Sequence, residues 1–168
     1  MLKRLLFSAC LVAFAAVAMV AQTTHTLQVA GSSDDAEELS ATEANPGLNA
    51  GDLDLASSDL ELVDDIGWNG AGQTVGVRFS NLDVPQGALI VDAFLEFAID
   101  DDNNGPTTVY FKVQDAANAV TFANTPYNIS SRPVFADSVA WAIPAWETPE
   151  IGQTRQTPPV TNLVQAPC

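Results

Sequence analysis

The chain has 168 residues, with six lysines and arginines against 21 aspartates and glutamates, so its formal net charge at pH 7 is −15. This length suffices for one domain with a hydrophobic core. A surface this negative disfavours binding to nucleic acid and to anionic membranes, because both contacts depend on lysine and arginine; it suits solubility, high salt or the capture of divalent cations.

The chain begins like a secretory signal peptide. Two basic residues precede the apolar run LLFSACLVAFAAVAMVA at 5–21, and small residues crowd the end of that run. We expect cleavage after Ala21 or Ala18, so that residues 1–21 are a leader and the protein is exported. An uncleaved membrane anchor is the alternative. The mature chain would hold four basic residues against 21 acidic ones, a formal charge of −17, and no membrane span.

An acidic cluster follows a polar stretch. We expect residues 22–31 to be a mobile N-terminal segment and residues 32–168 to be a single domain, which opens with SSDDAEE at 32–38. Adjacent carboxylates repel one another unless a cation or an arginine relieves them. A solvated acidic edge strand is the simplest interpretation; a structural calcium site, or pairing with Arg78 or Arg132, are the alternatives. The acidic residues are Asp34, Asp35, Glu37 and Glu38.

Alternating apolar and polar residues predict a series of short, half-buried strands. DLELV and TVGVRFS alternate at 59–63 and 74–80, and after a turn at 82–88 the run LIVDAFLEFAI is apolar at every second position from 89 to 99. No helical pattern persists for three turns after the leader. We therefore expect an all-β fold, an antiparallel β-sandwich of jelly-roll type. Further strands are expected at 107–114, 120–123, 138–143 and 160–165.

The connection at 98–108 reads AIDDDNNGPTT. Its Asp100, Asp102 and Asn104 fall at alternate positions before a glycine, which is the opening half of a calcium-binding loop. The complete loop also needs a later bidentate glutamate, and Phe111 stands at that position. The expected flanking strands exclude the helix-loop-helix form. A weaker calcium site in a hairpin loop is one interpretation, and a solvated connection is the simpler one.

Catalytic motifs are missing from the sequence. The single histidine, His25, lies a few residues past the expected cleavage point, which leaves no histidine for a zinc site or a serine triad. Lys112 is the one lysine after the leader, which argues against Schiff-base chemistry and phosphate handling. Among 21 acidic residues, a carboxylate pair carries almost no information. We therefore expect a non-enzymatic protein without an organic cofactor.

Aromatic residues give the best indication of a ligand. Carbohydrate recognition often stacks an exposed aromatic ring on a sugar, with amides and carboxylates on its hydroxyl groups. Trp68 lies in the segment DIGWNGAGQ, where ligand contact and loop packing are equally reasonable, and Asn69 and Gln73 are polar neighbours that could contact the same ligand. Trp146 lies in IPAWE and could join this site, although packing is the simpler interpretation. Trp141 fits an alternating core face.

The order of segments resembles a known type of secreted bacterial domain. The resemblance is to DNRLRE-type, carbohydrate-binding-module-like β-sandwich domains, over about residues 32–165. It is carried, in order, by SSDDAEE, SSDLELVDD, VGVRFSNLDVPQGALIVDAFLEFAIDDD, NISSRP, VAWAIPAW and QTPPVTNLVQ, although the DNRLRE string itself is not present. The resemblance implies a non-catalytic module that binds polysaccharide or attaches to a cell surface.

The end of the chain departs from those domains. In them the TP…VQ segment continues into an EIV stretch and further strands, whereas this chain ends at VQAPC. The sequence therefore predicts a sandwich that is incomplete at its C-terminal edge, because the reading frame is truncated or because a partner covers that edge.

Together these features predict a secreted module that binds a neutral polysaccharide, or an anionic one bridged by calcium. Two alternatives remain open. The first is a structural or adhesive building block whose open edge adds to a neighbouring strand. The second is an accessory domain of a larger extracellular protein that has no ligand site of its own.

Overall fold

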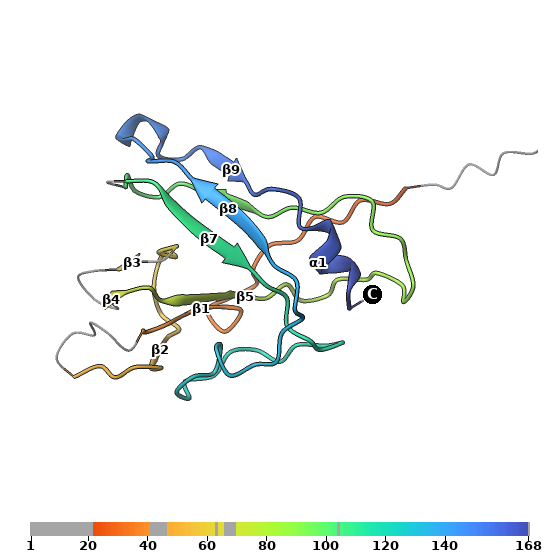
Figure 1. The fold of residues 1–168 in the computed structure, drawn as a ribbon, viewed down its shortest axis with the longest axis horizontal. Coiled ribbons are helices and arrows are strands. Elements are labelled where there is room, and N and C mark those ends of the chain that lie inside the picture. Colours follow the sequence, from red (N-terminus) through yellow and green to blue (C-terminus); the bar gives the residue numbers. More distant parts are fainter. Residues whose placement is uncertain (1–21, 41–46, 63, 66–69, 104, 168) are drawn as a thin grey trace, which may run out of the picture.

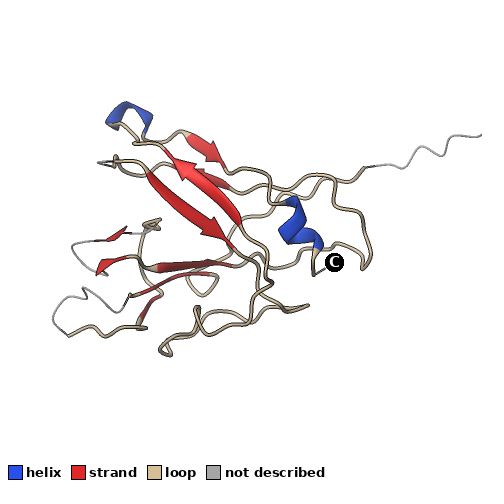
Figure 2. Ribbon diagram, viewed as in Figure 1, coloured by secondary structure: helices blue, strands red, loops and turns tan. Residues whose placement is uncertain are grey.

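The computed structural model describes residues 22–167 apart from 41–46, 63, 66–69 and 104. In this part of the chain strands predominate and helix is confined to two short segments (Figure 2). Every strand pair is antiparallel, which confirms the predicted all-β class. The described elements are β1 (Asp35–Glu38), β2 (Leu53–Asp54), β3 (Asp64–Asp65), β4 (Gly70–Ala71), β5 (Thr74–Val77), β6 (Glu96–Ala98), β7 (Thr107–Phe111), β8 (Val139–Ile143), η1 (Thr148–Glu150), β9 (Thr154–Gln156) and α1 (Thr161–Gln165).

The acidic segment forms the middle strand of a three-stranded sheet. β1 pairs with β2 on one side and with β5 on the other, so that Glu37 lies opposite both Asp54 and Val75. The side chains of Glu37 and Glu38 are buried. The interpretation of this segment as a solvated edge strand is therefore wrong, because both edges of β1 are paired.

A second group of strands packs around three aromatic rings. β7 pairs with β8, and β6 pairs with β9. Phe97 of β6, Phe111 of β7 and Trp141 of β8 stack on one another, with ring centroids between 5.7 and 6.4 Å apart. Trp141 is buried, as its place in an alternating strand predicts. The rings thus join two separate strand pairs, which lie above β1, β2 and β5 in Figure 1.

A small apolar core lies between the three-stranded sheet and the 122–129 loop, and an apolar groove lies between the two groups of strands. The buried cluster consists of Ala36, Leu53 and Phe122, with two partly buried neighbours. A groove of about 320 Å³ lies between β5 and β6, and Val77 and Phe97 are among the residues that line it. Both side chains are only half-buried. The facing strands therefore leave part of their apolar surface uncovered.

The alternating run at 89–99 forms a strand only near its end, where β6 lies. Leu89 and Val91 are 81% and 59% exposed. The run lies against the C-terminal part of the chain, because the Val160 N–H donates to the Ala93 carbonyl at 2.8 Å. This contact holds the run extended but builds no regular ladder there. The predicted inward face is therefore exposed at its start, whereas it is half-buried from Ala93 onward and buried at Ile99.

The predicted strand at 160–165 is wrong, because this segment forms helix α1. Val160 and Leu163 are three residues apart and both are buried, which is helical spacing. The side-chain oxygens of Thr161 and Gln165 accept hydrogen bonds from backbone N–H groups of the preceding run. The helix therefore pairs with that run through side chains. No helix in the described part of the chain has the length and apolar character needed to cross a bilayer.

Two other predicted strands are loops in the described chain. Residues 120–123 form one backbone hydrogen bond to the turn that precedes β1, which the Phe122 N–H donates to the Ser33 carbonyl at 2.8 Å. Residues 59–62 are assigned to no strand, although Glu61 is tied to β1 by its own backbone N–H. Alternation in these segments thus reflects apolar residues that pack individually.

Candidate functional site

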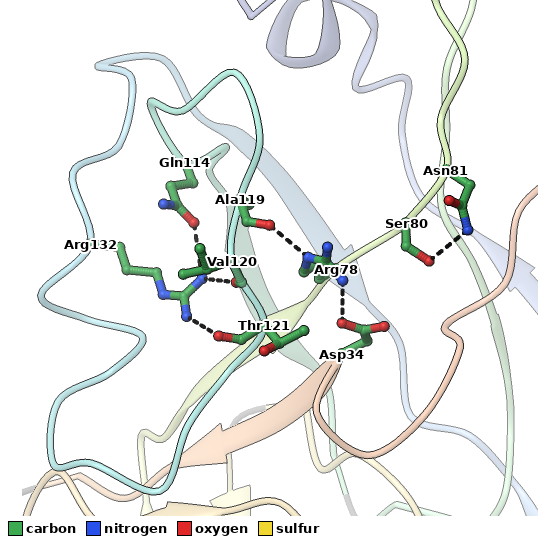
Figure 3. A network of polar contacts seen from close by, with 9 residues as sticks. All are labelled: Asp34, Arg78, Ser80, Asn81, Gln114, Ala119, Val120, Thr121 and Arg132. Carbon is green, nitrogen blue, oxygen red and sulfur yellow. Dashed lines mark hydrogen bonds and ion pairs between the residues drawn. The ribbon is translucent and has the colours of Figure 1, made fainter.

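Asp34, the first residue of the acidic cluster, forms an ion pair with Arg78. The Arg78 Nη1 lies 2.5 Å from the Asp34 Oδ1, and Figure 3 shows the two side chains pointing toward one another. The Arg78 Nε also donates to the Ala119 carbonyl at 2.7 Å. This confirms one of the alternatives, in which an arginine relieves the cluster. Arg132, the other candidate, donates to neutral acceptors such as the Gln114 Oε1.

Glu38 is stabilised by backbone N–H groups. Its Oε2 accepts hydrogen bonds from the N–H of Ile129 at 2.7 Å and from the N–H of Ser130 at 2.9 Å. Two donors that converge on one carboxylate oxygen stabilise its charge. Asp35 lies one residue before the apolar Ala36 and is half-buried. Glu38 therefore serves as an anchor for the 129–130 turn.

Glu37 is fully buried and contacts a second glutamate. Its Oε1 accepts hydrogen bonds from the Glu61 N–H at 2.7 Å and from the Gln73 Nε2 at 3.0 Å. Burial, the largest cause, and a hydrogen bond between the Glu37 and Glu61 side chains together raise the pKa of Glu37 to about 8. Gln73, predicted as a ligand contact, is buried and also donates to the Glu61 carbonyl at 2.6 Å. Its amide nitrogen is therefore occupied inside the protein.

Three of the four carboxylates of the cluster, those of Asp34, Glu37 and Glu38, thus have separate partners. Successive side chains of a strand point to opposite faces, so Glu37 and Glu38 diverge from one another. In the part of the chain that the structure describes, no group of three or more histidine, cysteine, aspartate and glutamate side chains is placed to hold a metal ion. The calcium site at this cluster stays a prediction.

An acidic groove lies beside β2. Its volume is about 490 Å³, and three of its lining residues, Leu39, Leu48 and Leu53, are leucines. Three of its carboxylates already accept local hydrogen bonds through one oxygen each: Asp52 from the Asn49 N–H, Asp54 from the Ala56 N–H and Asp59 from the Ser58 hydroxyl. The polar lining consists of Asp52, Asp54, Ser57, Ser58, Asp59 and Glu61.

Sequence reasoning missed this groove. The signal that could have found it is the stretch DLDLASSDLE at 52–61, which alternates acidic and apolar residues before two serines. The same alternation predicts an ordinary half-buried strand equally well. Its role as a groove wall depends on how it folds back beside β1, which the local pattern does not contain.

The predicted calcium loop lies against Trp146. Asp100 and Asp102 are exposed, and the Thr148 hydroxyl donates to the Asp102 Oδ2. The Asn103 Oδ1 accepts a hydrogen bond from the Trp146 N–H at 2.9 Å. The loop is therefore tied to the segment after β8. Asn104, the third predicted ligand, lies outside the described residues, and the metal site at this loop stays a prediction.

Trp146 packs beside the aromatic stack. Its ring lies 6.3 Å from that of Trp141, tilted by 52°, and its side chain is half-buried. The indole Nε1 is buried and has no hydrogen-bond partner in the described structure. Trp68 and Asn69, the other predicted ligand contacts, lie outside the described residues. They belong to the connection between β3 and β4, and β3 begins three residues after Glu61 of the acidic groove.

Comparison of the chain with protein-family models, with curated proteins and with solved structures found no match.

Proposed function

We propose that the chain is an exported, non-catalytic β-sandwich module that binds a glycan in the acidic groove. The observation that carries the proposal is the combination, in about 490 Å³, of carboxylates and serine hydroxyls with leucine side chains. Sugar hydroxyl groups donate hydrogen bonds to carboxylates, and the apolar C–H faces of a sugar ring pack on aliphatic side chains. The volume falls within the range of small-ligand sites.

The charge of the groove narrows the class of glycan. Four lining residues are acidic, and in the described chain each of the two ion pairs between side chains lies elsewhere, at Asp34 and at Glu150. A polyanionic glycan would be repelled by these carboxylates. We therefore infer a neutral polysaccharide, or an anionic one whose charge a bound calcium ion bridges to the protein. Trp68 is the proposed stacking residue, because the connection that carries it follows the groove closely in sequence.

The proposal assigns no catalytic step. Glu37 has a pKa raised to about 8, and a raised pKa is what the acid of a hydrolase requires. Its side chain is fully buried and its Oε1 already accepts two hydrogen bonds, so it does not touch a ligand in the groove. His25 is exposed in the N-terminal segment. Binding alone is therefore the function that these residues support.

Affinity electrophoresis through gels that contain a soluble neutral polysaccharide tests the proposal. Gels with galactomannan, xyloglucan or dextran would be compared with gels that contain none. We expect retardation in at least one gel, and we expect Asp59→Asn and Trp68→Ala to reduce it. Asp83→Asn is the matched control, because it makes the same chemical change at an exposed aspartate that is not part of the groove. Retention that is equal in all four proteins would contradict the proposed site.

A structural or adhesive role is the second candidate function. It is favoured by the exposed apolar side chains of the 79–94 segment, among which Leu89 is 81% exposed. Exposed apolar patches of this kind mark association surfaces. This candidate predicts concentration-dependent self-association in sedimentation velocity, abolished by Leu89→Lys. Val120→Lys is the control, since Val120 is similarly exposed on a different loop. A monomer at all concentrations would exclude it.

A further inference from the structure

Two glutamates from distant parts of the chain meet inside the protein. Glu37 comes from the middle of β1, and Glu61 comes from the segment that precedes β3, 24 residues later. Their side chains hydrogen-bond one another, and the Glu61 N–H donates to the same Glu37 carboxyl group. Glu37 is fully buried, so water does not solvate this contact.

This contact requires a proton. An ionised carboxylate only accepts hydrogen bonds, so two carboxyl groups bond to one another only when one of them carries a proton and donates it. Two ionised carboxylates in contact and out of water would also repel strongly. The Glu61 Oε2 is buried and has no hydrogen-bond partner in the described structure. An oxygen left in that state is less costly on a neutral carboxyl than on a carboxylate.

Among the described residues, none of those packed against the pair supplies a compensating cation. Asp54, on the neighbouring strand β2, adds a further negative charge. On the other side β5 carries no titratable side chain, and Arg78, which follows it, is paired with Asp34. Gln73 approaches as a neutral amide and donates to Glu37. On β1 itself, Glu38 points to the opposite face, where backbone N–H groups hold it.

The pair also determines the position of one wall of the acidic groove. Glu61 lines the groove, as does Asp59 two residues earlier. In the described chain, the hydrogen bonds that tie residues 59–62 to other segments all involve Glu61, apart from the one that the neighbouring Ser58 hydroxyl donates to Asp59. The Glu61 N–H donates to Glu37, its side chain bonds the same group, and its carbonyl accepts from Gln73. Glu37 and Gln73 are therefore the anchors of this wall.

We propose that Glu37 and Glu61 share one proton and form a pH-sensitive latch, which holds the 59–62 wall of the acidic groove against β1 and releases it when the proton is lost. The ligand of this site is a proton. The latch requires no glycan, so its test does not depend on the proposed binding function.

The direction of the pH dependence follows from the burial of the pair. The pKa of Glu37 is raised in the folded protein from 4.5 to about 8. The folded state therefore holds one more proton than the unfolded state between these values, and stability falls as pH rises through this window. The stabilising contribution is complete below pH 4.5 and is lost as pH passes 8. An ordinary exposed glutamate contributes no such slope.

Two measurements on the full chain test the latch. The first is a carbon-13 NMR titration of the glutamate side-chain carboxyls between pH 4 and pH 10. We expect one signal, assigned to Glu37 by its loss in Glu37→Gln, to titrate near 8, and we expect Glu61→Gln to move that titration to lower pH. The second is hydrogen exchange of the Glu61 amide. Its protection factor, which corrects for the faster intrinsic exchange at high pH, should fall sharply above pH 8.

Substitutions distinguish the latch from a loss of stability at high pH that does not involve the Glu37–Glu61 pair. Glu37→Gln keeps a neutral side chain that both accepts and donates, so its urea midpoint should stay constant from pH 5 to pH 8 while that of the natural chain falls. Glu96→Gln is the control, because Glu96 is an exposed strand glutamate and its loss should leave the fall unchanged. A Glu37 titration near 4.5 in the natural chain would overturn the proposal, and this result needs no folded variant.

Discussion

Arg78 and Asp34 join the end of β5 to the start of β1 by side chain and by backbone together. The Arg78 Nη1 lies 2.5 Å from the Asp34 Oδ1, and the Arg78 N–H donates to the Asp34 carbonyl at 2.7 Å. The same guanidinium reaches the Ala119 carbonyl through its Nε. Three segments that are distant in sequence therefore meet at one arginine (Figure 3).

Removal of Asp34 should destabilise the protein substantially. Asp34→Ala leaves the Arg78 guanidinium without its counter-ion, and the Arg78 side chain is only 19% exposed to water. Removing one partner of an ion pair that is largely buried costs about 2–3 kcal/mol. Urea unfolding at neutral pH measures the loss, and the double variant with Arg78→Met should cost less than the sum of the two single changes. Glu150→Ala is the control, because its ion pair with Arg155 is more exposed and should contribute much less. Equal losses at both sites would contradict this ranking.

A methyl group at Gly76 should disturb the core. A Cβ at this position would lie 2.6 Å from the Phe122 Cζ and 3.2 Å from the Ile129 Cδ1. Phe122 has little room to move, because it is buried and the Arg132 guanidinium lies 4.5 Å from its ring centre. Overpacking of this kind costs roughly 1–3 kcal/mol. We expect Gly76→Ala to lower the melting temperature in calorimetry. Gly31→Ala, where the added Cβ has no neighbour within 4 Å, should leave it nearly unchanged.

The sequence predicted the strands whose alternation coincides with real pairing. β5, β7 and β8 all lie within alternating runs, and Trp141 is buried where that alternation places it. The run at 89–99 alternates just as clearly, yet Leu89 is exposed, because α1 and not a strand lies beside it. Alternation shows which side chains share a face, but whether another element covers that face depends on distant segments.

The same limit applies to the candidate site. The acidic cluster suggested calcium, arginine pairing or a solvated edge. The ion pair of Asp34 with Arg78 confirms the second, and the pairing of both edges of β1 excludes the third. The burial of Glu37 depends on Glu61 and Gln73, which lie 24 and 36 residues away. A buried carboxyl pair has no local signature, because the residues between its members carry no information about the contact.

Arg132 should be the residue on which the 114–132 loops depend. Its guanidinium donates to five oxygens of four residues in those loops, and it also covers the Phe122 ring. Its pKa is lowered, first by burial and then by the charge of Arg78. Lysine keeps the charge but lacks the planar set of donors, so Arg132→Lys should destabilise the protein by about 2 kcal/mol. The acceptors are the Gln114 Oε1, the carbonyls of Val120 and Thr121, and both oxygens of Asn128.

Limited proteolysis checks this prediction more directly than a melt. If Arg132 holds these loops, Arg132→Lys should be cleaved within residues 114–132 faster than the natural chain at the same fraction unfolded. Arg155→Lys serves as the control, since Arg155 donates to acceptors in its own segment, including Gln153 and the Thr154 carbonyl. Unchanged cleavage in Arg132→Lys would show that the Phe122 packing alone holds the loops.

Calcium should stabilise the chain, and the stabilisation should come from exposed carboxylates and not from β1. A ligand that binds only the folded state raises its melting temperature. Asp34 and Glu38 already have partners of their own, so calcium has to find oxygens elsewhere. The exposed Asp100 and the second oxygen of the exposed Asp102, whose Oδ2 accepts from the Thr148 hydroxyl, are candidates, as are the carboxylates of the acidic groove. We expect millimolar calcium to raise the melting temperature in calorimetry and excess EDTA to reverse the increase.

Two double variants then locate the ion. If the loop binds calcium, Asp100→Asn with Asp102→Asn should abolish the increase, and if the groove binds it, Asp54→Asn with Asp59→Asn should do so. Glu38→Gln is the control: it should lower the melting temperature, because the Ile129 and Ser130 N–H groups lose a charged acceptor, and it should leave the calcium increment intact. An equal melting temperature with and without calcium would show that the proposed function does not involve calcium. The groove would then bind a neutral glycan through its own carboxylates and hydroxyls, since an anionic glycan has no other cation to bridge it to this surface.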